Sequence, residues 1–227
     1  MRKIFLAPSI LSANFYKLGN DIEKTLLGGG DIIHFDIMDN HYVSNLTFGP
    51  LVLSSLRKNG IKSIIDVHIM AKPVDRLIYD CIKFGANFIT IHSDSTIHLN
   101  RSLKIIRDHG CKAGIAINPA QSLNFLEYIM DSIDLILVMT VNPGYSEQIF
   151  INEMLPKIKK IRSKIDNSNF KNILLSVDGG IKKKHIKNLV KIGVDIIVMG
   201  SEIFKKKDIY QTTKNIKKIL INYSKNY

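Results

Sequence analysis

The sequence predicts an α/β fold, a single-domain (β/α)8 TIM barrel spanning residues 1–227, and three observations support this prediction. Eight short apolar runs recur along the chain, segments of helical periodicity lie between them, and no low-complexity linker interrupts the series. Alternating strands and helices are typical of parallel βαβ units. Strands that are apolar on both faces favour a closed barrel covered by helices. The alternative is an open doubly wound sheet, but no glycine fingerprint follows the first run.

The eight predicted strands are rich in Ile, Val and Leu, as buried parallel strands are. In chain order they are IFLAPSI from Ile4, DIIHFDIM from Asp31, KSIIDVHIM from Lys62, FITIHSD from Phe88, KAGIAIN from Lys112, LILVMTV from Leu135, ILLSVDGG from Ile173 and DIIVMGS from Asp195. Helical periodicity is evident in FYKLGNDIEKTLL from Phe15, PVDRLIYDCIKFGA from Pro73 and INEMLPKIKKIRSKI from Ile151. We expect these segments to be amphipathic helices that cover the strands.

The beginning of the chain, MRKIFLAPSILSA, places two basic residues before an apolar stretch, as a signal peptide does. Pro8 breaks that stretch, and residues 4–10 also form a good first strand, so we expect no cleaved signal. No apolar run approaches the ~20 residues that span a bilayer. Two cysteines, Cys81 and Cys111, fit neither a disulfide framework nor a metal knuckle. We therefore expect a cytoplasmic protein in a reducing compartment, with no membrane partner.

The formal net charge of +12 is unevenly distributed. Residues 1–150 contain 14 basic and 14 acidic side chains, whereas residues 151–227 contain 18 basic and 6 acidic ones. A basic surface can bind nucleic acid. Here the lysines alternate with Ile and Leu at helical spacing, which is typical of the solvated face of amphipathic helices. We expect no nucleic-acid partner.

Polar side chains interrupt three of the predicted strands close to their C-terminal ends. An unpaired buried carboxylate costs several kcal/mol, so such residues need a role. Successive side chains of a strand point to opposite faces, and barrel active sites lie at the C-terminal strand ends. The residues that share the inward-facing parity are His34, Asp36 and Met38, then Asp66, His68 and Met70, then Ser176 and Asp178.

Two imidazoles and two carboxylates from this set, His34, Asp36, His68 and Asp178, form a suitable ligand set for Zn²⁺ or a first-row relative. Separately satisfied polar groups are the alternative, and the convergence of all four favours the metal site. Asp66 lies two residues deeper than His68, so we expect a hydrogen-bond partner rather than a ligand. For His92 we expect a structural or supporting role.

Glycine-containing turns follow the last three predicted strands, namely VNPGY, DGGI and MGS. Glycine lets backbone N–H groups approach an anion without a Cβ in the way. The loops after strands seven and eight are the usual phosphate-binding corner of this barrel. These turns together predict a phosphate site.

Six motifs in order along the chain resemble those of the ribulose-phosphate 3-epimerase family. They are SILSANF from Ser9, HFDIMDNHYVSNLTFGP from His34, DVHIMAKP from Asp66, TVNPGY from Thr140, VDGGI from Val177 and VMGSEIF from Val198. The resemblance implies a barrel of the ribulose-phosphate-binding type, an isomerase of the pentose phosphate pathway, and assembly into a homo-oligomer. The small-molecule partner it implies is a sugar phosphate.

Carried over to this chain, the resemblance implies roles for individual residues. The metal ligands are His34, Asp36, His68 and Asp178, which would hold one divalent ion per subunit (Zn²⁺, Fe²⁺, Mn²⁺ or Co²⁺). Asp36 and Asp178 are the paired acid and base. The substrate-binding residues are Ser9, His68, the methionine cap Met38, Met70 and Met139, and the phosphate groups Gly144, Tyr145, Ser146, Glu147, Gly179, Gly180, Gly200 and Ser201.

The chain departs from the family pattern mainly in the phosphate loop. The usual aromatic-Gly-Gly-Gln run after NPG is here 145–148, Tyr-Ser-Glu-Gln. Losing two glycines restricts the backbone, and the Glu147 carboxylate would be unfavourable if it pointed at a phosphate. Asn40 replaces a glycine and Ser44 a common proline.

The expected chemistry is inversion of a carbon next to a ketone through an enediolate, with Asp36 removing the proton and Asp178 returning one to the other face. Three alternatives stay open: an epimerase acting on a hexulose phosphate, a metal-dependent aldolase, and a non-catalytic sugar-phosphate sensor. The paired carboxylates argue against the sensor, which needs no acid and base.

Overall fold

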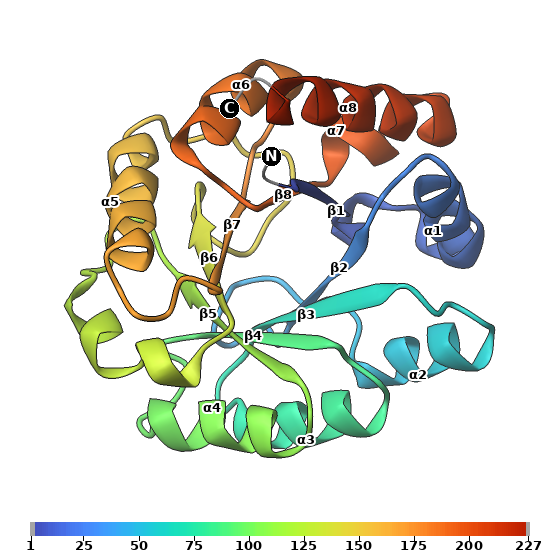
Figure 1. Ribbon diagram of the computed structural model, residues 1–227. Coiled ribbons are helices and arrows are strands. Elements are labelled where there is room, and N and C mark those ends of the chain that lie inside the picture. The colour runs from blue at the N-terminus through green and yellow to red at the C-terminus, as the bar shows by residue number, and fades with distance from the viewer. Residues whose placement is uncertain (1–2, 226–227) are drawn as a thin grey trace.

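Eight parallel strands form one sheet that curls into a barrel in the computed structural model, which describes residues 3–225 (Figure 1). The sheet order is β1-β8-β7-β6-β5-β4-β3-β2, so the pairing follows the chain around the barrel. The predicted single-domain barrel is confirmed. The strand bounds are β1 Phe5–Pro8, β2 Ile32–Met38, β3 Ile64–Met70, β4 Phe88–His92, β5 Lys112–Ile117, β6 Leu135–Met139, β7 Leu174–Asp178 and β8 Ile196–Met199.

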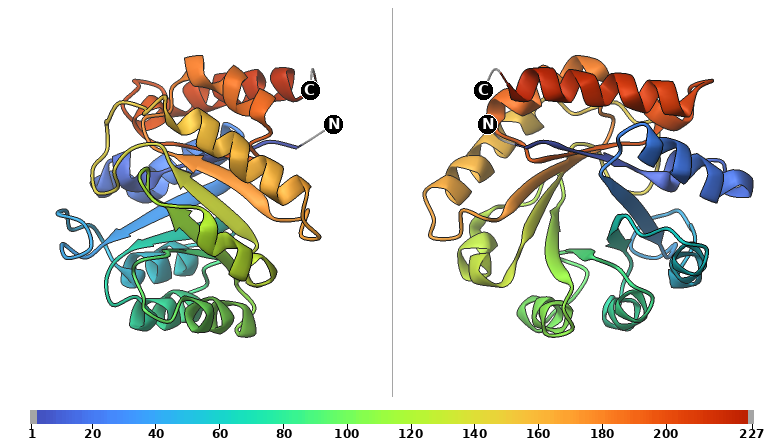
Figure 2. Two further views of the ribbon diagram at one scale, coloured as in Figure 1. Left: turned by 90° about the vertical axis from the view of Figure 1, so that its left-hand side faces the viewer. Right: turned by 45° about the vertical axis from the view of Figure 1, so that its right-hand side comes forward.

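Helices surround the strands on the outside (Figure 2). Their bounds are α1 Leu18–Leu27, α2 Pro50–Lys58, α3 Asp75–Lys83, α4 Leu99–Asp108, α5 Met154–Asp166, α6 Lys183–Ile192, α7 Ser201–Phe204 and α8 Ile209–Ser224, with 3-10 helices η1 Ile10–Ser12, η2 Phe15–Lys17, η3 Asn124–Tyr128 and η4 Met130–Ser132. Among the described residues, no helix has both the length and the apolar character needed to cross a membrane.

Strand alternation separates an outer core from the barrel interior. On β2, Phe35 and Ile37 join the large apolar cluster between strands and helices, where the Phe35 ring packs edge-on against Phe48 at 4.6 Å between centroids. His34 and Asp36, which alternate with them, are buried inside the barrel. The outer face of the strand is therefore apolar, whereas the inner face carries His34 and Asp36 between Ile32 and Met38, as the two-residue period predicts.

The barrel closes where β2 meets β1. The backbone N–H of Asp31 donates to the Leu6 carbonyl at 2.9 Å, and the Leu6 N–H donates to the Asp31 carboxylate at 2.8 Å. An isolated parallel bridge joins Ser9 to His34. The closure thus brings residue 9, just beyond β1, beside the polar residues of β2.

One connection departs from the regular repeat. Between β5 and β6 the chain forms η3 and η4 in place of an α-helix. In a 3-10 helix residues three apart share a face, and Leu126 and Ile129, three apart, are both buried there. This difference lies away from the residues that the sequence assigns to the site.

Candidate active site

A cavity opens at the C-terminal ends of the strands, and most of the predicted site residues line it. These are Ser9, Asp36, Met38, Met70, Met139, Gly144, Tyr145, Ser146, Glu147, Asp178, Gly179, Gly180, Gly200 and Ser201. His34 and His68 are completely buried and contact the lining residue Asp36. The structure therefore brings together residues that the chain separates by almost 200 positions.

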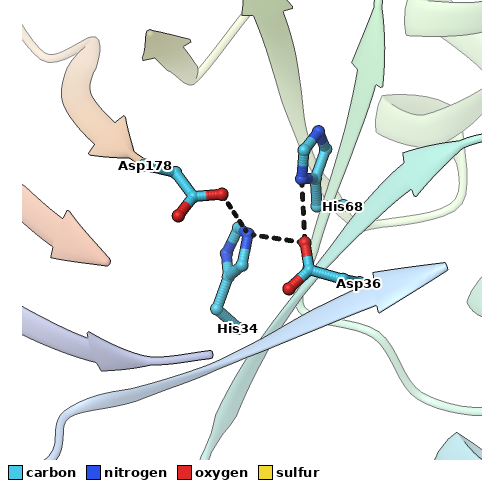
Figure 3. Close-up of side chains that lie close together, drawn as sticks. All are labelled: His34, Asp36, His68 and Asp178. Atoms are coloured by element: carbon cyan, nitrogen blue, oxygen red, sulfur yellow. Dashed lines mark hydrogen bonds and ion pairs between the residues drawn. The ribbon is translucent and has the colours of Figure 1, made fainter. Parts of the chain in front are cut away.

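The four predicted metal ligands form one compact group, with one potential ligand atom from each lying within 4.8 Å of the others (Figure 3). Asp36 Oδ1 is central, 3.3 Å from His34 Nε2 and 3.0 Å from His68 Nδ1. Asp178 approaches from β7, its Oδ2 3.7 Å from His34 Nε2. Nitrogen and carboxylate donors in this arrangement suit Zn²⁺ and other first-row divalent ions.

The orientation of the His34 ring is fixed by a carboxylate, as is usual for imidazoles that bind metal ions. Its Nδ1 lies 3.1 Å from Asp66 Oδ2, and Asp66 Oδ1 accepts a hydrogen bond from Thr90 Oγ1 at 2.8 Å. Its Nε2 has no hydrogen-bond partner within residues 3–225 and faces Asp36 and Asp178. A carboxylate that hydrogen-bonds the non-ligating nitrogen of a histidine is typical of metal sites. The Asp66–His34 contact therefore fits a divalent cation at His34 Nε2. The expectation that Asp66 supports rather than ligates agrees with this geometry.

The two carboxylates of the pair have opposite tendencies to ionise. Burial favours the neutral form of Asp36, but His34 and His68 outweigh it and hold the pKa of Asp36 well below its usual range. Burial, together with Asp36 and Asp66, raises the pKa of Asp178 against the opposing effect of the two imidazoles. The pKa of His34 is raised, because Asp36 and Asp66 outweigh the burial that lowers it. Carboxyl groups whose pKa values are driven apart are suited to separate base and acid roles.

Ser9 binds the more acidic of these carboxyl groups. Its Oγ donates to Asp36 Oδ2 at 2.6 Å, and both residues are buried. Asp36 therefore accepts a hydrogen bond from Ser9 on Oδ2 and lies within 3.3 Å of both imidazoles through Oδ1.

Three methionines lie along the cavity wall. Met38 and Met70 pack with Val43 in a small buried cluster, and Met139 belongs to the apolar interior of the barrel. Their thioethers provide an apolar, polarizable surface without an acidic proton.

Glycines shape the predicted phosphate corner. Gly179 and Gly180 have φ of 119° and 63°, which favours glycine. A Cβ on Gly180 would lie 2.5 Å from the Phe150 backbone nitrogen and 2.6 Å from the Gln148 carbonyl oxygen. The DGG turn is thus packed directly against the loop that follows β6.

The unusual residues of the β6 loop have defined partners. Glu147 adopts φ 64°, and its carboxylate lies 3.4 Å from Lys205 Nζ. The Tyr145 hydroxyl lies 3.1 Å from Ser44 Oγ, and Asn45 Nδ2 donates to the Gly144 carbonyl at 3.0 Å. The loops after β2 and β6 are therefore joined across the cavity mouth.

Several residues around the site were missed by the sequence reasoning. Thr90 shares the inward parity of His92 on β4, so alternation could have indicated it. Tyr42, Asn118 and Lys205 carry no local signal, because their contacts depend on how separate loops meet. His92, expected to support the structure, has its Nε2 2.9 Å from His68 Nε2. Burial and the neighbouring His68 lower the pKa of the His92 imidazole.

Comparison with known proteins gives a family match over residues 5–204, to the ribulose-phosphate 3 epimerase family. The chain is 51% identical over 220 residues to the ribulose-phosphate 3-epimerase of Buchnera aphidicola subsp. Acyrthosiphon pisum, covering 97% of this chain and 96% of that one. It is 50% identical over 208 residues to the enzyme of that name from Escherichia coli, covering 92% of each.

Solved structures with similar backbones include 3-hexulose-6-phosphate synthase from Salmonella typhimurium, with a TM-score of 0.74, 14% identity, and 97% and 100% of the two chains covered. KGPDC from Streptococcus mutans has a TM-score of 0.71 at 15% identity and covers 98% and 99%. At such low identity these two likenesses establish the barrel fold alone.

Proposed function

The chain belongs to the ribulose-phosphate 3-epimerase family, and we propose that its site interconverts D-ribulose 5-phosphate and D-xylulose 5-phosphate by two-base proton transfer at carbon 3. The observation that carries this mechanism is the placement of two carboxyl groups, Asp36 on β2 and Asp178 at the end of β7, in the wall of one cavity. The hexulose-phosphate and aldolase alternatives are not favoured, because the relatives at about half identity are epimerases of ribulose phosphate.

Epimerisation removes a weakly acidic proton from one face of the sugar and returns one to the other face. Asp36, ionised and oriented by Ser9, takes the proton from carbon 3 of D-ribulose 5-phosphate. Asp178, whose raised pKa favours its protonated form, supplies a proton to the opposite face of carbon 3. In the reverse reaction the two aspartates exchange these roles. Both groups come from different strands of the barrel and flank one cavity.

His34 through Nε2, His68 through Nδ1, and oxygens of Asp36 and Asp178 would hold one divalent ion per subunit, drawn from Zn²⁺, Fe²⁺, Mn²⁺ and Co²⁺. When bound, such an ion supplies positive charge that stabilises the oxygens of the enediolate by several kcal/mol. Met38, Met70 and Met139 exclude water from the reacting carbons and offer no proton that competes with the two aspartates.

The phosphate of the substrate is assigned to the glycine-rich corner of the same cavity. Gly144, Gly179, Gly180 and Gly200 bring backbone close to the cavity without a Cβ, and Ser201 offers a hydroxyl. The residues 145–147 of the β6 loop complete this wall. This corner and the Asp36–Asp178 pair line the same cavity, which suits a small phosphorylated sugar.

We also propose a place in the pentose phosphate pathway of the cytoplasm and assembly into a homo-oligomer. Two free, buried thiols are consistent with a reducing compartment. Phe15, Tyr16 and Leu51 are exposed along one groove beside α1 and α2, which offers an apolar subunit contact. Sedimentation velocity tests the assembly, and a monomer at micromolar concentration would contradict it.

The test of the function is a coupled epimerase assay on chelated protein reconstituted with Zn²⁺, Fe²⁺, Mn²⁺ or Co²⁺ separately. We expect activity only after a metal is restored, and deuterium at carbon 3 of the product in D₂O. Asp36→Asn and Asp178→Asn should each lose at least about 100-fold in kcat, as loss of a general acid or base typically does. Full activity of either variant, or retention of the original hydrogen at carbon 3, would refute the mechanism.

A further inference from the structure

His68 uses both of its ring nitrogens inside the barrel. Nδ1 lies 3.0 Å from Asp36 Oδ1, within the group of four metal-binding residues, and Nε2 lies 2.9 Å from Nε2 of His92. In Figure 3 the far nitrogen of His68 points away from the carboxylates. Both imidazoles are completely buried. His92, at the end of β4, is therefore the residue that contacts the ring nitrogen of His68 on the side away from the metal-binding group.

His92 also contacts Tyr42, in the loop that follows β2. The Tyr42 ring packs on it at 4.9 Å between centroids, and the Tyr42 hydroxyl donates to Asp94 Oδ1 at 2.7 Å while accepting from Asn118 Nδ2 at 2.9 Å. Within residues 3–225 the Nδ1 of His92 has no hydrogen-bond partner. An apolar ring would fill this space without leaving a buried nitrogen unpaired, so packing alone does not account for a histidine here.

The contact between the two Nε2 atoms requires one proton between them. A nitrogen that binds a cation must present its lone pair, and Nδ1 is the nitrogen of His68 that faces the other ligands. His68 then carries its proton on Nε2 and donates it toward His92, whose Nε2 accepts. The remaining proton of a neutral His92 lies on Nδ1, the atom without a partner.

We propose that His92 is a positioning residue for the metal site: by accepting from His68 Nε2–H it selects the tautomer and ring rotation that present His68 Nδ1 to the cation, while Tyr42 keeps His92 in place. The inference rests on the metal site of the proposed function. It gives the two histidine ligands different supports, because His34 is held by the carboxylate of Asp66 and His68 by a neutral ring. Loss of such an outer partner typically lowers metal affinity 10–100-fold.

The experiment compares Zn²⁺ dissociation constants, measured by competition with a chelator, in the full chain and three variants. His92→Phe keeps a ring but removes the acceptor, and we expect a 10–100-fold weaker Zn²⁺ complex. His92→Gln can place an amide oxygen near the former Nε2, and we expect affinity within about threefold of wild type. The control Ile91→Val alters a fully buried neighbour on the outer face of β4 and should lower stability without changing Zn²⁺ affinity.

Two further measurements separate a positioning role from a structural one. The visible spectrum of bound Co²⁺ should change in His92→Phe and remain as in wild type in Ile91→Val. In the Zn²⁺-loaded protein, imidazole ¹⁵N shifts should show His68 protonated on Nε2 and His92 on Nδ1. If His92→Phe does not fold, His92→Asn, whose amide is too short to reach His68, is expected to show the same loss of affinity.

Unchanged Zn²⁺ affinity and an unchanged Co²⁺ spectrum in a folded His92→Phe or His92→Asn protein would overturn the inference, as would a wild-type protein that binds no Zn²⁺. A His92 protonated on Nε2 in the loaded protein would do the same. A wild type without epimerase activity whose Zn²⁺ affinity still depends on residue 92 would refute the proposed function alone.

Discussion

Ser9→Ala removes the hydroxyl that donates to Asp36 Oδ2 at 2.6 Å within a buried site. A hydrogen bond to a charged group contributes about 1.5–3 kcal/mol, and the alanine leaves the carboxylate oxygen without that donor. Without this bond the Asp36 carboxylate is no longer held in one orientation toward carbon 3, and misplacement of a catalytic group by about 1 Å can cost ~100-fold, so we expect kcat/KM to fall by about 10- to 100-fold. Losing a donor also favours the neutral carboxyl, so the pKa of Asp36 should rise.

The assay is the pH profile of kcat/KM for D-ribulose 5-phosphate in wild type and Ser9→Ala, each loaded with the same metal. The rate should fall while the acidic limb keeps its position, because His34 and His68 still hold the pKa of Asp36 well below its usual range and the base stays ionised. Ser176→Ala is the matched control: it removes a buried hydroxyl that has no hydrogen-bond partner within residues 3–225, and should alter neither rate nor limb.

A folded Ser9→Ala protein that retains the wild-type rate would refute this role of Ser9. An equal loss of activity in Ser176→Ala would refute it too, since the effect would then follow from any lost hydroxyl in the barrel. Thermal unfolding of both variants shows whether a lost rate reflects lost protein.

Three other predictions concern the loops around the cavity. Gly180→Ala should raise the KM for the sugar phosphate and lower stability. The alanine Cβ would overlap the Phe150 backbone nitrogen, and a φ of 63° costs about 1–2 kcal/mol for a residue with a Cβ. An unchanged KM in steady-state kinetics would contradict this. Glu147→Gly should lower the KM for the sugar phosphate a few-fold, because it removes a carboxylate and a strained φ. Lys205→Met should raise that KM, because it leaves the Glu147 carboxylate unpaired. Equal shifts of KM with the same sign in both variants would exclude a role for Lys205 in pairing Glu147. Asp39→Asn should destabilise the protein in urea at pH 7, with the difference shrinking toward pH 3. Slight burial favours the neutral acid, but backbone N–H donors, including those of Lys72, His41 and Tyr42, outweigh it and lower the folded-state pKa of Asp39 below the unfolded one, so the stabilisation is lost as pH falls. A difference that grows on acidification would reverse that sign.

The strand pattern predicted which side chains face the barrel interior, because alternation is a local property. His34, Asp36 and His68 could be placed on the inner face from parity alone, since alternate side chains of any strand lie on one side. The barrel's parallel order then placed their strand ends at one mouth. Parity could not distinguish ligands from supports: depth along β3 suggested that Asp66 supports, and its contact with His34 Nδ1 agrees.

The β6 loop shows where sequence reasoning was weakest. The run 145–148 predicted a carboxylate that would oppose a phosphate, yet Glu147 is paired with Lys205, a residue 58 positions further on that follows α7. Similarly, Ser44 in place of proline gained meaning only from its contact with the Tyr145 hydroxyl. Such loop contacts depend on the relative placement of separate connections, which no local pattern specifies.

By itself, the sequence determined the barrel, the inward-facing histidines and aspartates, and the glycine turns, because apolar periodicity and backbone freedom are set within a few residues. Only the tertiary structure decided which nitrogen of each histidine faces the carboxylates, that Ser9 donates to Asp36, and that His92 Nε2 contacts His68 Nε2. Those facts follow from strand register and barrel closure, which join β1 to β2 and β3 to β4 across 24 to 27 residues of chain. A shift of register would leave every local pattern intact and still separate these atoms.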